Sequence, residues 1–139
     1  MRRSWIRYWA LATLAVGCGD PVLGPADVAG PSQAKAYVIV VNGTTNELLS
    51  RGATVNLRLN ADGTTSGRVT VPIVPGVQVT AVDDDLTGTY TINNGVVRLS
   101  GNSYLDGLAF TADPPELRAF ISFSDPNRVG TFNLTLIRQ

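Results

Sequence analysis

Leu86-Thr87-Gly88-Thr89-Tyr90-Thr91-Ile92-Asn93-Asn94-Gly95-Val96-Val97-Arg98-Leu99-Ser100 is the stretch that decides the fold class of this chain. Its first half alternates, with Leu86, Tyr90 and Ile92 on one face and threonines on the other, which is typical of a half-buried β-strand. The pair Asn94-Gly95 is the strongest short-range signal for a tight hairpin turn. A second apolar run follows it, so the stretch predicts two antiparallel strands.

The same pattern extends outward in both directions, without helical periodicity from residue 36 onward. Strands are expected at Ala36–Val41, Ala53–Asn60, Ser66–Val71, Leu86–Ile92, Val96–Ser100, Gly107–Ala112, Glu116–Phe123 and Gly130–Arg138. Short links between most of them favour sequential antiparallel pairing. We therefore predict an all-β fold, an eight-stranded antiparallel up-and-down barrel. A two-sheet β-sandwich has the same strand count and stays open as the alternative.

Alternation also predicts which side chains face the interior. The inward set is Val55, Leu57, Leu59, Tyr90, Ile92, Phe110, Ile121, Phe132, Leu134 and Leu136, whereas Thr89 and Arg58 should face solvent. The segment Pro72–Asp85 departs from the pattern because its prolines cannot donate to a β-ladder. We expect this segment to lie across one end of the barrel, with its valines against the rim.

The first 17 residues have the three parts of a secretory signal: three arginines, a short apolar run and a small-residue end. The apolar run Tyr8–Val16 is too short to span a bilayer as a helix, which needs roughly 20 residues. A single cysteine, Cys18, follows.

The sequence Leu14-Ala15-Val16-Gly17-Cys18 resembles the lipobox of bacterial lipoproteins. The resemblance implies cleavage after Gly17, lipidation of Cys18 and a membrane partnership through that lipid anchor. It implies a location in the bacterial cell envelope. Because Gly19 stands where an inner-membrane retention signal would place Asp, the outer membrane is the expected address. The predicted division is a signal at 1–17, a lipidated cysteine with a flexible Pro/Gly linker at 18–35, and a β domain at 36–139.

Three segments of the β region resemble successive strands of bacterial lipocalin-like domains: Leu57–Thr64, Leu86–Leu99 around its Asn-Gly turn, and Leu108–Thr111 with Leu117. The resemblance implies a calycin-like barrel. It transfers no ligand, because one fold hosts many functions.

Composition excludes several kinds of chemistry. The chain has no histidine and one cysteine, so histidine triads, imidazole acid–base catalysis and thiolate zinc sites are excluded. Residues 1–17 hold three of the 11 Lys and Arg and none of the 11 Asp and Glu, so the chain without them has a net charge of −3. A mildly acidic chain lacks the basic surface that binds nucleic acid. Asp83-Asp84-Asp85 lacks the spacing of a calcium loop. We expect no enzyme activity, no cofactor and no metal.

Aromatic side chains are the candidates for lining an apolar ligand pocket. They are Tyr37, Tyr90, Phe110, Phe120, Phe123 and Phe132, and among them Tyr37, Tyr90, Phe110 and Phe132 are the predicted ligand-binding residues. One hypothesis is a non-catalytic envelope lipoprotein that binds a small apolar molecule or a protein partner. The other is a scaffold lipoprotein with a filled core that acts through surface contacts. A connected internal cavity of roughly 300 Å³ or more would separate them.

Overall fold

The structure is a computed structural model that describes residues 22–102 and 104–139, so the predicted signal and Cys18 lie outside the described residues. Within these ranges the elements are α1 (Pro25–Val28), β1 (Gly30–Val41), β2 (Thr44–Glu47), the 3-10 helix η1 (Leu49–Arg51), β3 (Thr54–Leu59), β4 (Thr64–Val71), β5 (Val82–Asp85), β6 (Gly88–Asn93), β7 (Val96–Ser100), β8 (Ala109–Asp113), β9 (Glu116–Asp125) and β10 (Arg128–Arg138). No helix in the described part is long and apolar enough to cross a membrane.

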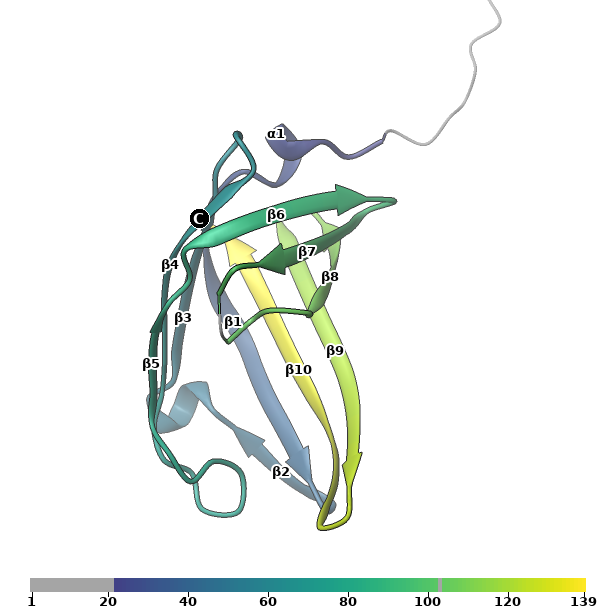
Figure 1. Cartoon of the computed structure of the whole chain (residues 1–139). Helices are drawn as coiled ribbons and strands as arrows, with labels where there is room; N and C mark the ends of the chain where they lie inside the picture. Colours follow the sequence, from purple (N-terminus) through teal and green to yellow (C-terminus); the bar gives the residue numbers. More distant parts are fainter. Residues whose placement is uncertain (1–21, 103) are drawn as a thin grey trace, which may run out of the picture.

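Eight antiparallel strands close into a barrel, in the order β1-β3-β4-β6-β7-β8-β9-β10, with β10 pairing back onto β1 (Figure 1). This confirms the predicted eight-stranded barrel and sets the sandwich aside. The hairpin predicted around Asn94-Gly95 is β6–β7, in which Tyr90 pairs with Leu99 and Asn93 with Val96. Its turn residue Asn94 has φ 50°, the left-handed conformation that a tight Asn-Gly turn requires.

Two short strands, β2 and β5, lie outside the ring of eight. The edge of β1 that faces away from β10 pairs with β3 only over Gly30–Gln33 and then with β2 over Val38–Val41. On β4, the edge opposite β3 pairs with β6 at Thr64 and Thr65 and then with β5. Away from the end that carries α1, β1 therefore separates from β3, and β4 separates from β6.

The difference in strand length leaves the lower half of the barrel incompletely covered. β9 and β10 have 10 and 11 residues, whereas β7 and β8 have 5 each. At about 3.3 Å per residue, the short strands reach only about half as far as the long ones. In Figure 1, β6 and β7 cross the upper half while β1, β9 and β10 continue below them.

Most of the ten residues predicted to face the interior do so. Seven of the ten are buried, and Ile92 and Phe132 are partly buried against the core. Thr89 and Arg58 are exposed, as expected. Ile121 is the exception, with 41% of its surface exposed. It lies in the part of β9 beyond the β8 ladder, which ends at Ala119.

The predicted boundary of the β domain at residue 36 is wrong, because β1 begins at Gly30 and α1 precedes it. The expected linker therefore runs, from Pro25 on, in ordered structure. Pro31 is tolerated in the strand because a proline still accepts hydrogen bonds, and its carbonyl accepts one from the Gln139 N–H at 2.9 Å.

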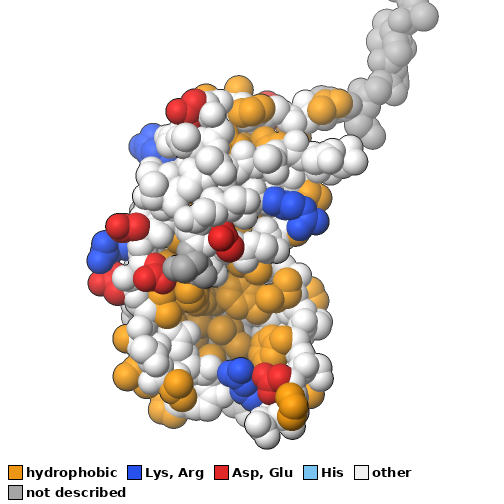
Figure 2. Space-filling model, in the orientation of Figure 1, with side chains coloured by type: hydrophobic (Ala, Val, Ile, Leu, Met, Phe, Trp, Pro, Cys, Tyr) orange, Lys and Arg blue, Asp and Glu red, His pale blue; other side chains and the backbone are white. Residues whose placement is uncertain are grey.

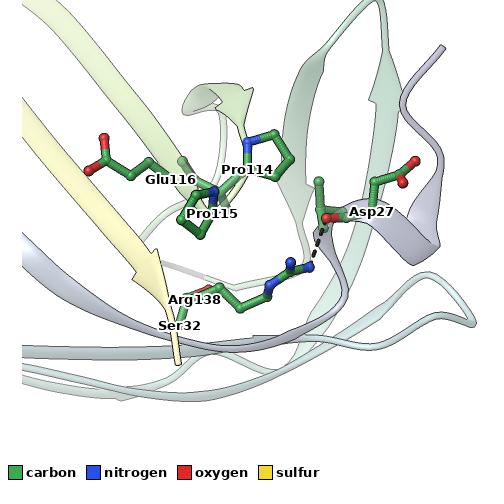
Figure 3. Close-up of a pocket in the computed structure, with 8 residues that line it drawn as sticks. Asp27, Ser32, Pro114, Pro115, Glu116 and Arg138 are labelled. Carbon is green, nitrogen blue, oxygen red and sulfur yellow. Dashed lines mark hydrogen bonds between the residues drawn. The ribbon is translucent and has the colours of Figure 1, made fainter. Parts of the chain in front are cut away.

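The α1 segment closes the upper end of the barrel. Val28 is buried in the core, and the Arg138 guanidinium donates to the Asp27 carbonyl oxygen at 2.8 Å (Figure 3). The gap between α1 and the Pro114-Pro115 turn holds only about 10 Å³, space for about one water molecule. The upper end is therefore filled.

The segment Pro72–Asp85 only partly follows the prediction. Val74 is buried and Val77 packs against the core, as expected for valines at the rim. Ile73 and Val79 are exposed instead, and Val82–Asp85 forms β5 on the edge of β4. No strand is expected at Val82–Asp85, because the prolines and missing alternation of Pro72–Asp85 indicate a loop and because aspartate is disfavoured in strands.

Candidate functional site

An apolar hollow opens in the lower half of the barrel, visible in Figure 2 as a recess of hydrophobic side chains. One pocket of about 180 Å³ is lined by Ile39, Val41, Val77, Phe123 and Arg128. A second of about 270 Å³ shares Val41 and Val77 and is also lined by Asn42, Thr44, Asn46, Pro75 and Gly76. We call these two neighbouring pockets the lower trough.

Each wall of the lower trough follows from strand alternation. Tyr37, Ile39 and Val41 occupy every second position of β1 and face the interior, while Phe123 faces it from β9. Val77 comes from the loop before β5, which an isolated bridge between Val74 and Gln78 folds into a tight turn. The trough thus gathers residues from three segments that are far apart in sequence.

A pair of tyrosines marks the upper limit of the trough. The hydroxyls of Tyr37, in β1, and Tyr104, in the loop after β7, form a hydrogen bond with each other. Since the strand order places β7 opposite β1 in the ring, this contact bridges the barrel interior. Burial raises the pKa of both phenols, and the charge of Asp84 raises that of Tyr104 further. Both remain neutral hydroxyls at physiological pH.

The loop that carries Tyr104 is held from within. The Asn102 side-chain oxygen accepts a hydrogen bond from the Leu105 N–H at 2.7 Å, and the Asn102 N–H donates to Asp106 Oδ1 at 3.1 Å. Leu105 is fully buried, which anchors the turn in the core. The Asn102 Nδ2 group is buried without a partner among the described atoms.

The charge at the rim of the trough is neutralised locally. Arg128, which lines the trough, forms an ion pair with Asp125 at 3.1 Å. Backbone N–H donation from Asn127 and the nearby Arg128 charge hold the pKa of Asp125 below its usual value. The carboxylate therefore stays ionised and paired near neutral pH. Because this charge is paired and the side chains around it, Ile39, Val41, Val77 and Phe123, are apolar, an uncharged occupant is favoured there.

The four predicted ligand-binding residues do not form one site. The rings of Tyr37 and Phe132 meet edge to face, with centroids 5.3 Å apart. Phe110 is fully buried in the core, and the Tyr90 hydroxyl donates to the Asn60 carbonyl at 2.7 Å. Only the Tyr37–Phe132 pair lies next to the trough: Phe132 pairs directly with Ile39, and Tyr37 is the next inward residue of β1.

The acidic triplet is part of the sheet. Strand alternation turns Asp83 and Asp85 to the same side, where Arg68 binds them at 2.8 and 3.0 Å. The Arg68 guanidinium lowers the pKa of Asp83. Among residues 22–102 and 104–139, no group of three or more side chains is arranged to hold a metal ion.

Sequence reasoning missed Ile39, Val41, Val77, Arg128 and Tyr104 as site residues. The first two lie in the nearly continuous apolar strand Ala36–Val41, where alternation does not separate an inward from an outward face. Alternation also carries no signal for which half of the interior is uncovered. Tyr104 lies in a loop, where periodicity gives no direction at all.

Comparison with known proteins adds no relative: the chain matches no protein-family model, no curated protein and no solved structure.

Proposed function

We propose that this chain is a non-catalytic lipoprotein of the bacterial cell envelope whose lipocalin-like barrel holds a small apolar molecule in the lower trough. The observation that carries the proposal is the open recess of hydrophobic side chains in Figure 2, together with the pocket that Ile39, Val41, Val77 and Phe123 line. Folded proteins normally bury such surface, and an exposed concave apolar patch usually marks a binding site.

The size of the trough supports a small ligand. Its two pockets share Val41 and Val77 and have volumes of about 180 and 270 Å³, each somewhat below the roughly 300 Å³ at which ordinary ligand pockets begin. The polar groups of β2, Thr44 and Asn46, line one side and provide hydrogen-bonding partners. This arrangement suits an elongated neutral molecule with one polar end.

The lipobox-like sequence supports the cellular location. Acylation of Cys18 would attach the domain to a membrane, and Gly19 favours the outer membrane. Three acyl chains bind a bilayer far more firmly than one, which alone holds only marginally. Replacing Cys18 with serine should therefore release the protein from the membrane fraction and abolish incorporation of labelled fatty acid. A variant that stays membrane-bound would contradict the anchor.

Ligand binding is tested with two aspartate variants of the same loop. Val77 lines the trough, whereas Val79 is 87% exposed. A neutral apolar fluorescent probe such as N-phenyl-1-naphthylamine should bind the native chain, and Val77→Asp should weaken its binding at least about tenfold because it places a charge in an apolar pocket. Val79→Asp should bind like the native chain.

Equal probe binding by the two aspartate variants, or no binding by the native chain, would contradict the trough as a ligand site. The second candidate, a scaffold that acts through surface contacts, would then be favoured. Its supporting observation is the filled upper half of the barrel, where α1 and the Pro114-Pro115 turn leave only about 10 Å³.

A further inference from the structure

The lower part of β9 has one edge without a partner strand among the described residues. β10 pairs with β9 along its whole length, but β8 pairs only with Glu116–Ala119. From Phe120 to Asp125, the edge of β9 that faces away from β10 is therefore free. Free strand edges are the usual sites at which another strand adds.

The direction of the backbone groups on this edge follows from one hydrogen bond. The Asn42 N–H donates to the Val129 carbonyl at 2.8 Å, so Val129 bonds toward β1. Alternate residues of an antiparallel strand bond to opposite neighbours, so Gly130 bonds toward β9 and its partner Phe123 bonds toward β10. It follows that the N–H and C=O groups of Ser122 and Ser124 point out of the free edge.

The free edge lacks the features that usually protect an exposed strand. Between Phe120 and Ser124 there is no proline, lysine or other charged residue. Each face of the edge has an exposed apolar side chain, since Phe120 is 63% exposed on the outer face and Ile121 is 41% exposed on the inner face. Asp125, at the end of the strand, is engaged by Arg128.

We propose that a second copy of this chain pairs with β9 along this edge, antiparallel, about a twofold axis through Ser122. In this register Ser122 meets its symmetry mate and Phe120 lies opposite Ser124, so all outward-pointing backbone groups find partners. The same register places Ile121 opposite Phe123 of the second copy. Each copy thus covers the apolar side chain that the other exposes, which is the self-complementarity of an isologous dimer.

A small edge-to-edge contact of this kind is expected to be weak, so its formation should depend on concentration. The experiment uses the full chain carrying Cys18→Ser, without added ligand, so its outcome is independent of the anchor and of the trough. Sedimentation velocity should show a monomer that becomes a dimer as concentration rises. A chain that stays monomeric at every concentration would overturn the proposal.

Ser122 provides a matched pair of variants. Ser122→Pro removes only an N–H that faces the free edge and leaves the bonds to β10 intact, a position where an edge strand tolerates proline. It should weaken the dimer at least about tenfold, because two hydrogen bonds are lost by symmetry. Ser122→Ala keeps the N–H and should dimerise like the parent, and equal dimerisation of the proline variant would overturn the proposal.

A cross-link tests the register and does not depend on the folding of the proline variant. Directly opposed residues of a hydrogen-bonded pair lie about 5.5 Å apart between Cα atoms, within the range of a disulfide. Ser122→Cys, in the Cys18→Ser chain, should form disulfide dimers under mild oxidation. Asn133→Cys, exposed on β10 away from the edge, is the control. Equal dimer yields from both cysteines would contradict the pairing.

Discussion

The uncovered lower half of the barrel predicts that two residues on one face of one strand contribute very differently to stability. Leu117 and Ile121 both face inward from β9, but Leu117 is 4% exposed and Ile121 is 41% exposed. Leu117→Ala removes a fully packed side chain and should cost about 2–5 kcal/mol, which includes the cavity that it leaves. Ile121→Ala removes the same number of carbons, worth about 2.4 kcal/mol when fully buried.

Since only about three-fifths of the Ile121 side chain is shielded, its truncation should cost about 1.4 kcal/mol, and no closed cavity remains because the space already opens to water. Urea unfolding at low micromolar concentration, where edge pairing is negligible, measures both costs, with an unchanged m-value as the check on two-state behaviour. If Ile121→Ala cost as much as Leu117→Ala, the lower half would be closed over Ile121, and the trough would not exist.

Three further changes test other parts of the structure. Tyr37 has a pKa above its ordinary value, so only the unfolded chain loses this proton above pH about 10. Stability should therefore fall by about 1.4 kcal/mol per pH unit there, and Tyr37→Phe should flatten that fall in unfolding measured across pH. Gly130→Ala would place a Cβ 1.8 Å from the Val40 carbonyl oxygen, and a loss of about 3 kcal/mol or more is expected in thermal unfolding; a native-like melting temperature would show that β1 and β10 are farther apart. Leu57→Asp buries an unpaired charge and should prevent folding, whereas Arg58→Asp, on the exposed face, should not; circular dichroism measures both.

The fold class was predictable because its signals are local. Alternating side chains and the Asn94-Gly95 turn determine strand direction, facing and hairpin pairing within a few residues of one another. The inward positions of β3, Val55, Leu57 and Leu59, needed no tertiary information, and all three are buried. The lipobox-like sequence around Cys18 is likewise a local pattern, and its meaning stays a prediction.

The tertiary structure decided which inward positions are covered. Ile121 has the same parity as Leu117, and alternation cannot separate them, because their difference depends on where the shorter strand β8 ends relative to β9. Tyr104 reaches Tyr37 only because the ring of strands brings β7 opposite β1.

Contacts with neighbouring strands also decide where β1 begins and why the acidic segment forms β5. Prolines in the expected linker predicted a tether, but the long β10 offers a partner as far as Arg138, and β1 extends back to Gly30 to pair with it and with β3. Asp83 and Asp85 enter a strand because Arg68 on the neighbouring strand compensates their charge. Sequence determined the local geometry of each strand, whereas closure of the ring determined the trough, the tyrosine bridge and the free edge of β9, since these depend on contacts between segments far apart in the chain.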